Sequence, residues 1–489
     1  MPRSPRSLLP FLLLYFISKS EFSSSLSHAA DVCLLRSVFF NRENFVKKRW
    51  IVPLALLAAS SLLFAQSSMP DMQMDDHQQQ GMKMEMNMSG KASSFVEEIR
   101  NHASSGTSAE PNSTPAPMLM TMRDNWMLML HGNAFVADTQ QTSPRGKDAF
   151  FSTNWIMPMA QRQWGPGHLT LRTMLSLEPA TVTGRQYPLL FQQGETAFGK
   201  PIADGQHPHD FVMEFAALYD WNLAPKTLLS FYAAPVGDPA IGPTAYPHRF
   251  SAFENPVGTL GHHQEDSTHI SDDVITVGLT QGMVRIEASG FHGREPNEHR
   301  WQVQQGAIDS WSTRLTVQPG QDWSGQYSYG RLHSPEQLYP TEDQERMTAS
   351  IMNNHPFGES DKMNLASTIG WGRTRNLQDN VVQNSYLLES TLRFASKNYA
   401  YTRIENVDRT TELLLGENTP PPGFEELPAG RVQAYTFGYD RDFKSLPNLE
   451  TALGAQVTAY TVGSRLEPVY GSDPMGVVFF LRIRPIGKH

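Results

Sequence analysis

The stretch His168–Glu178, HLTLRTMLSLE, alternates between apolar and polar side chains along its whole length. Successive side chains of an extended chain point to opposite faces, so the stretch has two faces of different character. The apolar face consists of Leu169, Leu171, Thr173, Leu175 and Leu177. The polar face consists of His168, Thr170, Arg172, Ser176 and Glu178. This pattern predicts a strand with an apolar medium on one side and a polar interior on the other.

The same alternation recurs in other segments, among them Ser385–Phe394 and Gly476–Pro485. A soluble β-sandwich also alternates, so one strand alone does not separate the two classes. The polar faces are more informative because they repeatedly carry charge, at Arg172, Glu214, Arg285, Glu287, Arg314, Glu389, Arg393 and Arg482. The apolar faces of these strands carry none, which favours lipid on that side.

From Trp126 to the C-terminus we mark sixteen strand-like segments, separated by gaps that alternate between short and long. The long gaps are 139–149, 179–209, 237–270, 293–309, 333–345, 375–383, 407–429 and 462–475. The short gaps are 163–167, 224–226, 281–282, 319–320, 355–361, 396–397 and 443–448. Trp164, Trp221 and Trp323 lie beside short gaps, where an interfacial aromatic girdle belongs. The layout predicts an all-β fold: a transmembrane, antiparallel up-and-down β-barrel of about 16 strands.

Composition agrees with this fold class. The chain has 489 residues, of which 39% are hydrophobic, and beyond residue 66 it has no apolar run of the length that a membrane helix needs. The net charge of −9 argues against a nucleic-acid partner. The single cysteine, Cys33, lies before the predicted cleavage site, so the mature chain is expected to have no thiol chemistry.

The N-terminal region reads as an export signal followed by a tether. Three basic residues precede the apolar run 50–64, and we expect a signal peptide over residues 46–65 with cleavage after Ala65. Residues 1–45 are then a mis-assigned start or a disordered segment, with Val46 as the true initiator. Residues 66–123 are expected to be a disordered Met-rich periplasmic arm with at most a short helix at 93–103, and residues 124–489 form the barrel.

Methionine is concentrated in the arm, and the first group of candidate metal ligands is Met69, Met72, Met74, His77, Met82, Met84, Met86 and Met88. Thioether sulfur is a soft ligand that selects Cu(I) and works in an oxidising compartment. The neighbours of these residues are polar, so core packing does not explain them. A second methionine cluster covers residues 118–129, where Met127 and Met129 either bind metal or face lipid.

The arm segment MPDMQMDDHQQQGMKMEMNM, residues 69–88, resembles the Met-rich segment of the copper-resistance protein B family. Proteins of that family carry such a segment between a signal peptide and an outer-membrane barrel. The resemblance covers this segment and the general plan, and it does not extend to the sequence of the barrel. It implies copper handling at the outer membrane.

Histidines gather in the two longest gaps. His207, His209 and Asp210 form one group of candidate metal ligands, and we expect both imidazoles to point the same way. The second group is His262, His263 and His269. Both loops also contain many apolar residues, namely 187–191, Phe198, Ile241, Tyr246, Phe250, Phe253, Val257 and Leu260. We therefore predict that one or both loops fold into the lumen or cap it.

These observations predict an outer-membrane channel of a Gram-negative bacterium that handles a small solute, with copper ions captured by the Met-rich arm. Two alternatives remain open, which are a general porin with an incidental tether and a structural or adhesive barrel. No nucleophile elbow, metalloprotease motif or phosphate loop is present, so we expect no enzyme. We expect no cofactor other than copper ions. The expected partners are the lipid bilayer and small solutes or metal ions, and a homotrimer is common in this class.

Overall fold

The computed structural model describes residues 92–358, 362–443 and 446–487. Sixteen long strands build the wall: β2 (Trp126–Gln141), β3 (Ala149–Trp164), β4 (Gly167–Leu175), β9 (Val212–Ala224), β10 (Thr227–Gly237), β11 (Ser271–Gln281), β12 (Val284–His292), β13 (Ser310–Val317), β14 (Trp323–Leu332), β15 (Gln344–Phe357), β16 (Met363–Asn376), β17 (Val382–Phe394), β18 (Asn398–Thr410), β19 (Pro428–Phe443), β20 (Leu449–Val462) and β21 (Met475–Pro485).

The remaining elements are short and are not among these sixteen strands. They are α2 (Phe95–Asn101), β1 (Leu119–Arg123), α3 (Glu178–Thr181), β5 (Tyr187–Pro188), β6 (Glu195–Ala197), β7 (Lys200–Ile202), β8 (Gly205–Gln206), α4 (His262–Glu265), the 3-10 turn Ser267–His269, α5 (Glu412–Leu415) and α6 (Glu467–Tyr470). Among the described residues no helix is long and apolar enough to cross a membrane.

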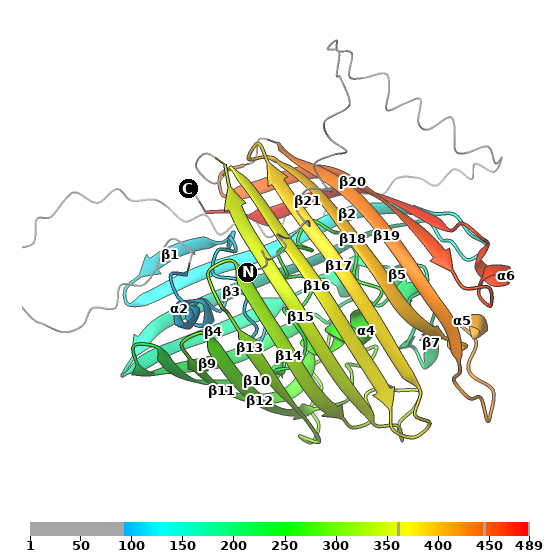
Figure 1. Cartoon of the computed structure of the whole chain (residues 1–489), viewed down its shortest axis with the longest axis horizontal. Coiled ribbons are helices and arrows are strands. Elements are labelled where there is room, and N and C mark those ends of the chain that lie inside the picture. The colour runs from blue at the N-terminus through cyan, green and yellow to red at the C-terminus, as the bar shows by residue number, and fades with distance from the viewer. Residues whose placement is uncertain (1–91, 359–361, 444–445, 488–489) are drawn as a thin grey trace, which may run out of the picture. The chain divides into compact units, whose positions relative to one another are not determined.

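The wall is a closed antiparallel barrel (Figure 1). Each long strand pairs with its neighbours in sequence, and β2 pairs with both β3 and β21, with Ala134 opposite Ile483, which joins the two ends. Closure leaves no open edge in the ring, as strands in a bilayer require. The prediction of sixteen up-and-down strands is confirmed, and the predicted short and long gaps match the observed turns and loops within a few residues.

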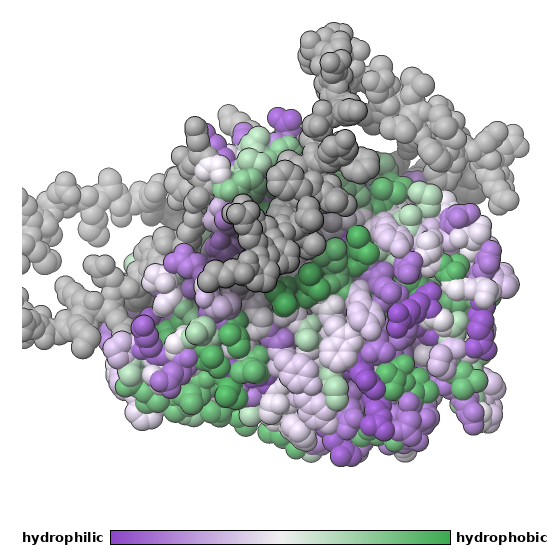
Figure 2. Space-filling view, in the orientation of Figure 1, coloured by the Kyte–Doolittle hydropathy of each residue, from purple (hydrophilic) through white to green (hydrophobic). Residues whose placement is uncertain are grey.

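The outer face of the barrel is apolar. Exposed side chains from many strands form it, including Leu171, Phe215, Phe231, Ile275, Ile286, Ile351, Ile369, Phe437, Leu453 and Phe479. Figure 2 shows such residues gathered at the lower left, over the strands labelled β9–β12 in Figure 1. Trp164, Trp221 and Trp323 are 59%, 42% and 50% exposed beside short turns, where the girdle was predicted. Short turns mark the periplasmic end of such a barrel and long loops the outer end.

The expectation of a disordered arm is wrong for residues 92–123. Residues 119–123 form β1, which pairs with the start of β2, and α2 begins with a hydrogen bond from the Glu97 N–H to the Ser94 hydroxyl. Most side chains between 92 and 112 are buried. We call residues 92–118 the N-terminal segment. It lies inside the lumen towards the short turns, where Ser113 bonds to Gln321 and Asn354.

Both long loops fold into the barrel, as predicted. The β4–β9 loop (residues 176–211) and the β10–β11 loop (residues 238–270) are buried over most of their length. Their apolar side chains pack together, Tyr187, Leu190 and Phe191 being at most 1% exposed. Phe198 is an exception: it is 62% exposed at the tip between β6 and β7, so its predicted burial is wrong.

Met127 and Met129 face the lumen, at 5% exposure each, so the alternative that they face lipid is wrong. They share the inner face of β2 with the buried residues His131 and Asn133. The outer face of the same strand segment carries Leu128 and Leu130, so both faces of this segment are apolar and the sequence left its orientation open.

Candidate functional site

The lumen itself is the candidate site, and Arg172 on β4 is its most connected side chain. Its guanidinium donates two hydrogen bonds to the Glu214 carboxylate, at 2.7 and 2.8 Å. It also donates to three backbone carbonyls of the N-terminal segment, those of His102 (3.0 Å), Ser104 (2.6 Å) and Gly106 (2.5 Å). One wall residue therefore holds both its own counter-ion and the backbone that fills the lumen.

Further contacts hold the same segment across the lumen. The His102 ring lies 2.6 Å from the Asp220 carboxylate, and the Ser105 hydroxyl donates to Asp238. Four strands further along the wall, Arg314 on β13 pairs with Glu287 on β12 and donates to the Thr107 hydroxyl at 3.0 Å. The segment thus has polar contacts from β9 to β13, and its apolar residues Phe95, Val96 and Ile99 pack with Leu228 of β10.

A second set of ion pairs holds the β10–β11 loop. Arg249 of the loop donates to Glu389 on β17 at 2.5 Å, and Arg403 on β18 donates to the same carboxylate at 3.1 Å. Glu254 of the loop pairs with Arg482 and Arg484 on β21. The loop therefore places one cationic side chain, Arg249, and one anionic side chain, Glu254, against charged residues of the inner wall.

The candidate ligands of the β4–β9 loop do not converge. His207 faces Glu195 at 3.5 Å, His209 faces Glu178 at 3.0 Å, and Asp210 pairs with Arg300 at 3.5 Å. The two imidazoles have different partners because residues 207–210 do not form the strand on which alternation would align them. Burial lowers the pKa of His207 to about 4, with Arg300 acting in the same direction. Burial also opposes the charge on His209, but Glu178 raises its pKa above the ordinary value.

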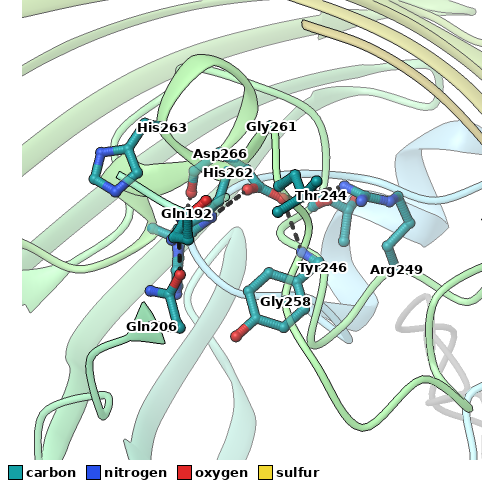
Figure 3. A network of polar contacts seen from close by, with 12 residues as sticks. Gln192, Gln206, Thr244, Tyr246, Arg249, Gly258, Gly261, His262, His263 and Asp266 are labelled. Carbon is teal, nitrogen blue, oxygen red and sulfur yellow. Dashed lines mark hydrogen bonds and ion pairs between the residues drawn. The ribbon is translucent and has the colours of Figure 1, made fainter. Parts of the chain in front are cut away.

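The structure instead brings His209 beside the candidate ligands of the β10–β11 loop. Its ring centroid lies 5.3 Å from that of His269, which lies 5.1 Å from that of His262. Figure 3 shows Asp266 between His262 and Tyr246: its carboxylate lies 2.6 Å from His262 Nδ1 and accepts the Tyr246 N–H at 3.0 Å. The candidate ligands of the two loops are separate in sequence, and they meet where both loops fill the lumen.

The charges of this cluster depend on burial. Burial lowers the pKa of His269 well below its ordinary value, and nearby His262 and His209 add to the effect. Burial opposes ionisation of Asp266, but the hydrogen bond and charge of His262 hold its pKa below the ordinary range. His263 turns away, with Nε2 2.8 Å from Glu195.

Within residues 92–358, 362–443 and 446–487, no group of three or more His, Cys, Asp and Glu side chains is arranged to hold a metal ion. The arm ligands Met69, Met72, Met74, His77, Met82, Met84, Met86 and Met88 lie outside the described residues. Metal binding by the arm residues and by the loop histidines stays a prediction.

Sequence reasoning singled out the methionines of residues 118–129 but missed those of β3, β4 and β9, with which they form one cluster in the inner wall. Its members come from four adjacent strands and the end of the N-terminal segment, and they are Met118, Met127, Met129, Met157, Met159, Met174 and Met213. His131 and His248 lie against the same cluster, with His248 Nε2 3.0 Å from the Met174 sulfur. Met127 and Met129 alternate in step with the polar residues His131 and Asn133, and this pattern could have identified them as facing the lumen.

Little free space remains inside. One cavity of about 20 Å³ borders His131 and His248, and another of about 30 Å³ borders Glu178 and His209. Each holds about one water molecule. A larger hollow of about 300 Å³ lies at the outer mouth, between Arg185 and Trp301. In this conformation the two inner cavities are too small for a solute larger than a small ion.

The sequence matches no protein-family model and no curated protein sequence. Three solved barrels are similar in structure. The anion-selective porin from Comamonas acidovorans is 10% identical, with a TM-score of 0.45, and the match covers 73% of this chain and 99% of that chain. OmpF of Salmonella typhi, solved with daunomycin, is 10% identical at a TM-score of 0.45, covering 74% and 100%. OprB of Pseudomonas putida is 9% identical at 0.45, covering 74% and 94%.

Closure, an apolar outer belt, tryptophans beside the short turns and a polar inner wall are the features of barrels in the Gram-negative outer membrane. Each of them is present in the wall described above. The chain is a closed sixteen-strand β-barrel of the outer membrane.

Proposed function

We propose that this chain is an outer-membrane channel for a small solute, that it is closed in the present conformation, and that copper ions captured by the Met-rich arm are its solute. The observation that supports a channel is that the lumen is filled by segments of the chain that are not wall strands. A sixteen-strand barrel is wide enough for an aqueous pore. Here that space is occupied by the N-terminal segment and two loops, which are held to the wall by ion pairs, hydrogen bonds and apolar packing.

Polar contacts of this kind favour a displaceable filling. Arg172 holds the N-terminal segment through backbone carbonyls, which water replaces readily when the segment leaves. The Arg172–Glu214 pair lies wholly in the wall and remains intact after such a movement. A general porin would conduct without this displacement, and a structural barrel would not conduct at all.

The test is conductance of the full chain in planar bilayers, with and without copper on the side of the short turns. The proposal expects low basal conductance and discrete openings that increase with Cu(I). A large, constant conductance that copper does not change would favour the general porin. A silent bilayer under every condition would favour the structural barrel.

The copper assignment has its own test. A peptide of residues 67–90 is titrated calorimetrically with Cu(I), because this segment carries the thioether groups. Binding tighter than the millimolar range supports capture by the arm. Binding no tighter than that removes copper as the cargo of the arm and leaves the channel proposal standing.

A further inference from the structure

Three neighbouring wall strands place a histidine and two methionines in one transverse row inside the lumen. His131 on β2 is the register partner of Met157 on β3. Met157 in turn lies opposite Met174 on β4, because the adjacent residues Ile156 and Leu175 are paired. Directly opposed side chains on one face of a sheet have Cβ atoms about 4.5–5.5 Å apart. His131 is 4% exposed and both methionines are fully buried.

A second histidine closes this row from the interior. His248 belongs to the β10–β11 loop and is 6% exposed. Its Nε2 lies 3.0 Å from the sulfur of Met174, and its ring centroid lies 6.0 Å from that of His131. The Trp155 ring lies within 4.1 Å of the His248 ring and 4.8 Å of the His131 ring, and so excludes water from one side of both.

The ring nitrogens of these histidines are poorly satisfied. Neither nitrogen of His131 makes a hydrogen bond of normal geometry, although the backbone of Ala103 lies beside the ring, and Nδ1 of His248 also has no partner. Buried polar atoms are nearly always hydrogen-bonded, so each exception calls for an explanation. A bound metal ion that accepts the nitrogen lone pairs would explain why these ring nitrogens have no hydrogen-bond partner.

The chemistry of the four side chains selects the ion. Neutral imidazole and thioether are ligands for soft metal ions, and no carboxylate or thiolate belongs to the row. The cavity of about 20 Å³ beside His131 and His248 is lined by the N-terminal segment and by neither methionine, so the ion would lie between the four side chains and not in this cavity.

We propose that His131, Met157, Met174 and His248 form a binding site inside the lumen for one soft monovalent metal ion of the Cu(I) or Ag(I) class. Tetrahedral ligands at about 2.0–2.3 Å from an ion are about 3.5 Å apart. The 3.0 Å separation of the His248 nitrogen and the Met174 sulfur therefore needs only a small side-chain adjustment.

The surrounding methionines extend the site towards the short turns. Met129 and Met159 are register partners in the next row, and Met127 follows on the same face of β2. Met118, at the end of the N-terminal segment, packs against them. These thioethers give an ion a series of soft contacts between the periplasmic mouth and the proposed site. The site deepens the proposed copper channel and rests on it for the nature of the cargo.

The competing explanation is apolar packing, since methionine also fills irregular gaps in cores. The other three buried apolar clusters of the described residues are built from Phe, Tyr, Leu, Ile, Val and Ala and contain no methionine. Replacing Met by Leu conserves volume and apolar character but removes the sulfur. The double variant M157L/M174L therefore separates ligation from packing. Met352 on β15 is equally buried and lies outside the cluster, so M352L is the matched control.

The experiment uses the full chain with the seven methionines of residues 69–88 changed to glutamine, so that this part of the arm contributes no thioether; these are Met69, Met72, Met74, Met82, Met84, Met86 and Met88. The protein in detergent is titrated with Ag(I) in chloride-free buffer, and X-ray absorption identifies the bound neighbours. We expect one ion per chain with sulfur and nitrogen neighbours. M157L/M174L weakens binding by about tenfold or more, as loss of ligand support does in other metal sites, and M352L leaves it unchanged.

Absence of Ag(I) binding, or equal binding by M157L/M174L and M352L, overturns the site. The heat-dependent gel shift of a folded barrel shows that each variant is folded before it is titrated. Passage of Ag(I) into vesicles separates this inference from the channel. Binding without passage leaves the site standing and removes the channel function. Passage at an equal rate through M157L/M174L and the control leaves the channel standing and removes the site.

Discussion

Removing the charges of the Arg172–Glu214 pair should release the N-terminal segment without unfolding the barrel. The perturbation is the double substitution R172Q/E214Q. R172Q alone would leave a buried carboxylate without its cation, and breaking a buried pair in that way costs about 3–5 kcal/mol. In the double variant both side chains are neutral, and Tyr232 still donates a hydrogen bond to position 214.

The size of the effect follows from the three carbonyls that Arg172 holds. A hydrogen bond from a charged donor contributes about 1.5–3 kcal/mol, and glutamine retains at most one of the three. Two bonds at the lower value amount to about 3 kcal/mol, which is roughly a hundredfold shift towards the released state.

The assay is thiol labelling of Ser105→Cys, because Ser105 is 1% exposed inside the lumen and the native chain has a single cysteine, Cys33, before the predicted cleavage site. A membrane-impermeant maleimide should label R172Q/E214Q about a hundredfold faster than the parent. Arg403→Gln is the matched control, since Arg403 holds carbonyls of the β10–β11 loop in the same way. Equal labelling of the parent and R172Q/E214Q, or an equal gain in R403Q, would refute the reasoning.

Three further results are expected. Gly106 has φ +57°, and a Cβ there would lie 2.6 Å from the Asp238 carbonyl oxygen. A side chain in this left-handed conformation costs about 1–2 kcal/mol, so Gly106→Val should raise the rate of Ser105→Cys labelling by at least about tenfold. Leu171→Lys on the lipid face should destabilise the barrel by about 2–4 kcal/mol in urea unfolding from vesicles if Leu171 lies near the bilayer midplane. Burial, with Glu426 beside it, raises the pKa of Glu412 from 4.5 to about 8, so the outer β18–β19 loop is most stable below pH 4.5 and loosens as pH rises towards 8. Proteolysis of that loop should follow this trend, and E412Q should abolish it.

The wall could be predicted from the sequence because lipid imposes a local rule on it. Every strand must alternate, and turn lengths must alternate between the two ends, so the pattern is readable without knowing any contact. Inward folding of the two long loops was also predictable, because Tyr187 and Phe250 would otherwise be left in water.

The N-terminal segment was not predictable in the same way. Its composition of Ser, Thr and Pro indicates disorder, because no apolar period repeats in it. Its order comes from the wall, where Arg172 and Arg314 bond to its backbone and hydroxyl groups, and backbone groups leave no trace in a sequence. The convergence of His209 with His269 was hidden for a related reason, since two loops that are far apart in sequence meet only in the closed barrel.

The two fillings of the lumen differ in what their departure would cost. Withdrawal of the β10–β11 loop would separate Arg249 from Glu389 and Glu254 from Arg482, and each broken buried pair costs about 3–5 kcal/mol. Withdrawal of the N-terminal segment leaves the Arg172–Glu214 pair whole, but it removes His102 from the buried carboxylate of Asp220 and exchanges neutral carbonyls for water, at about 1.5 kcal/mol for each bond. The segment is also the part of the filling that follows directly from the Met-rich arm. An ion that binds the arm would therefore act on the element of the lumen whose departure breaks one buried ionic contact, His102–Asp220, whereas departure of the β10–β11 loop breaks several.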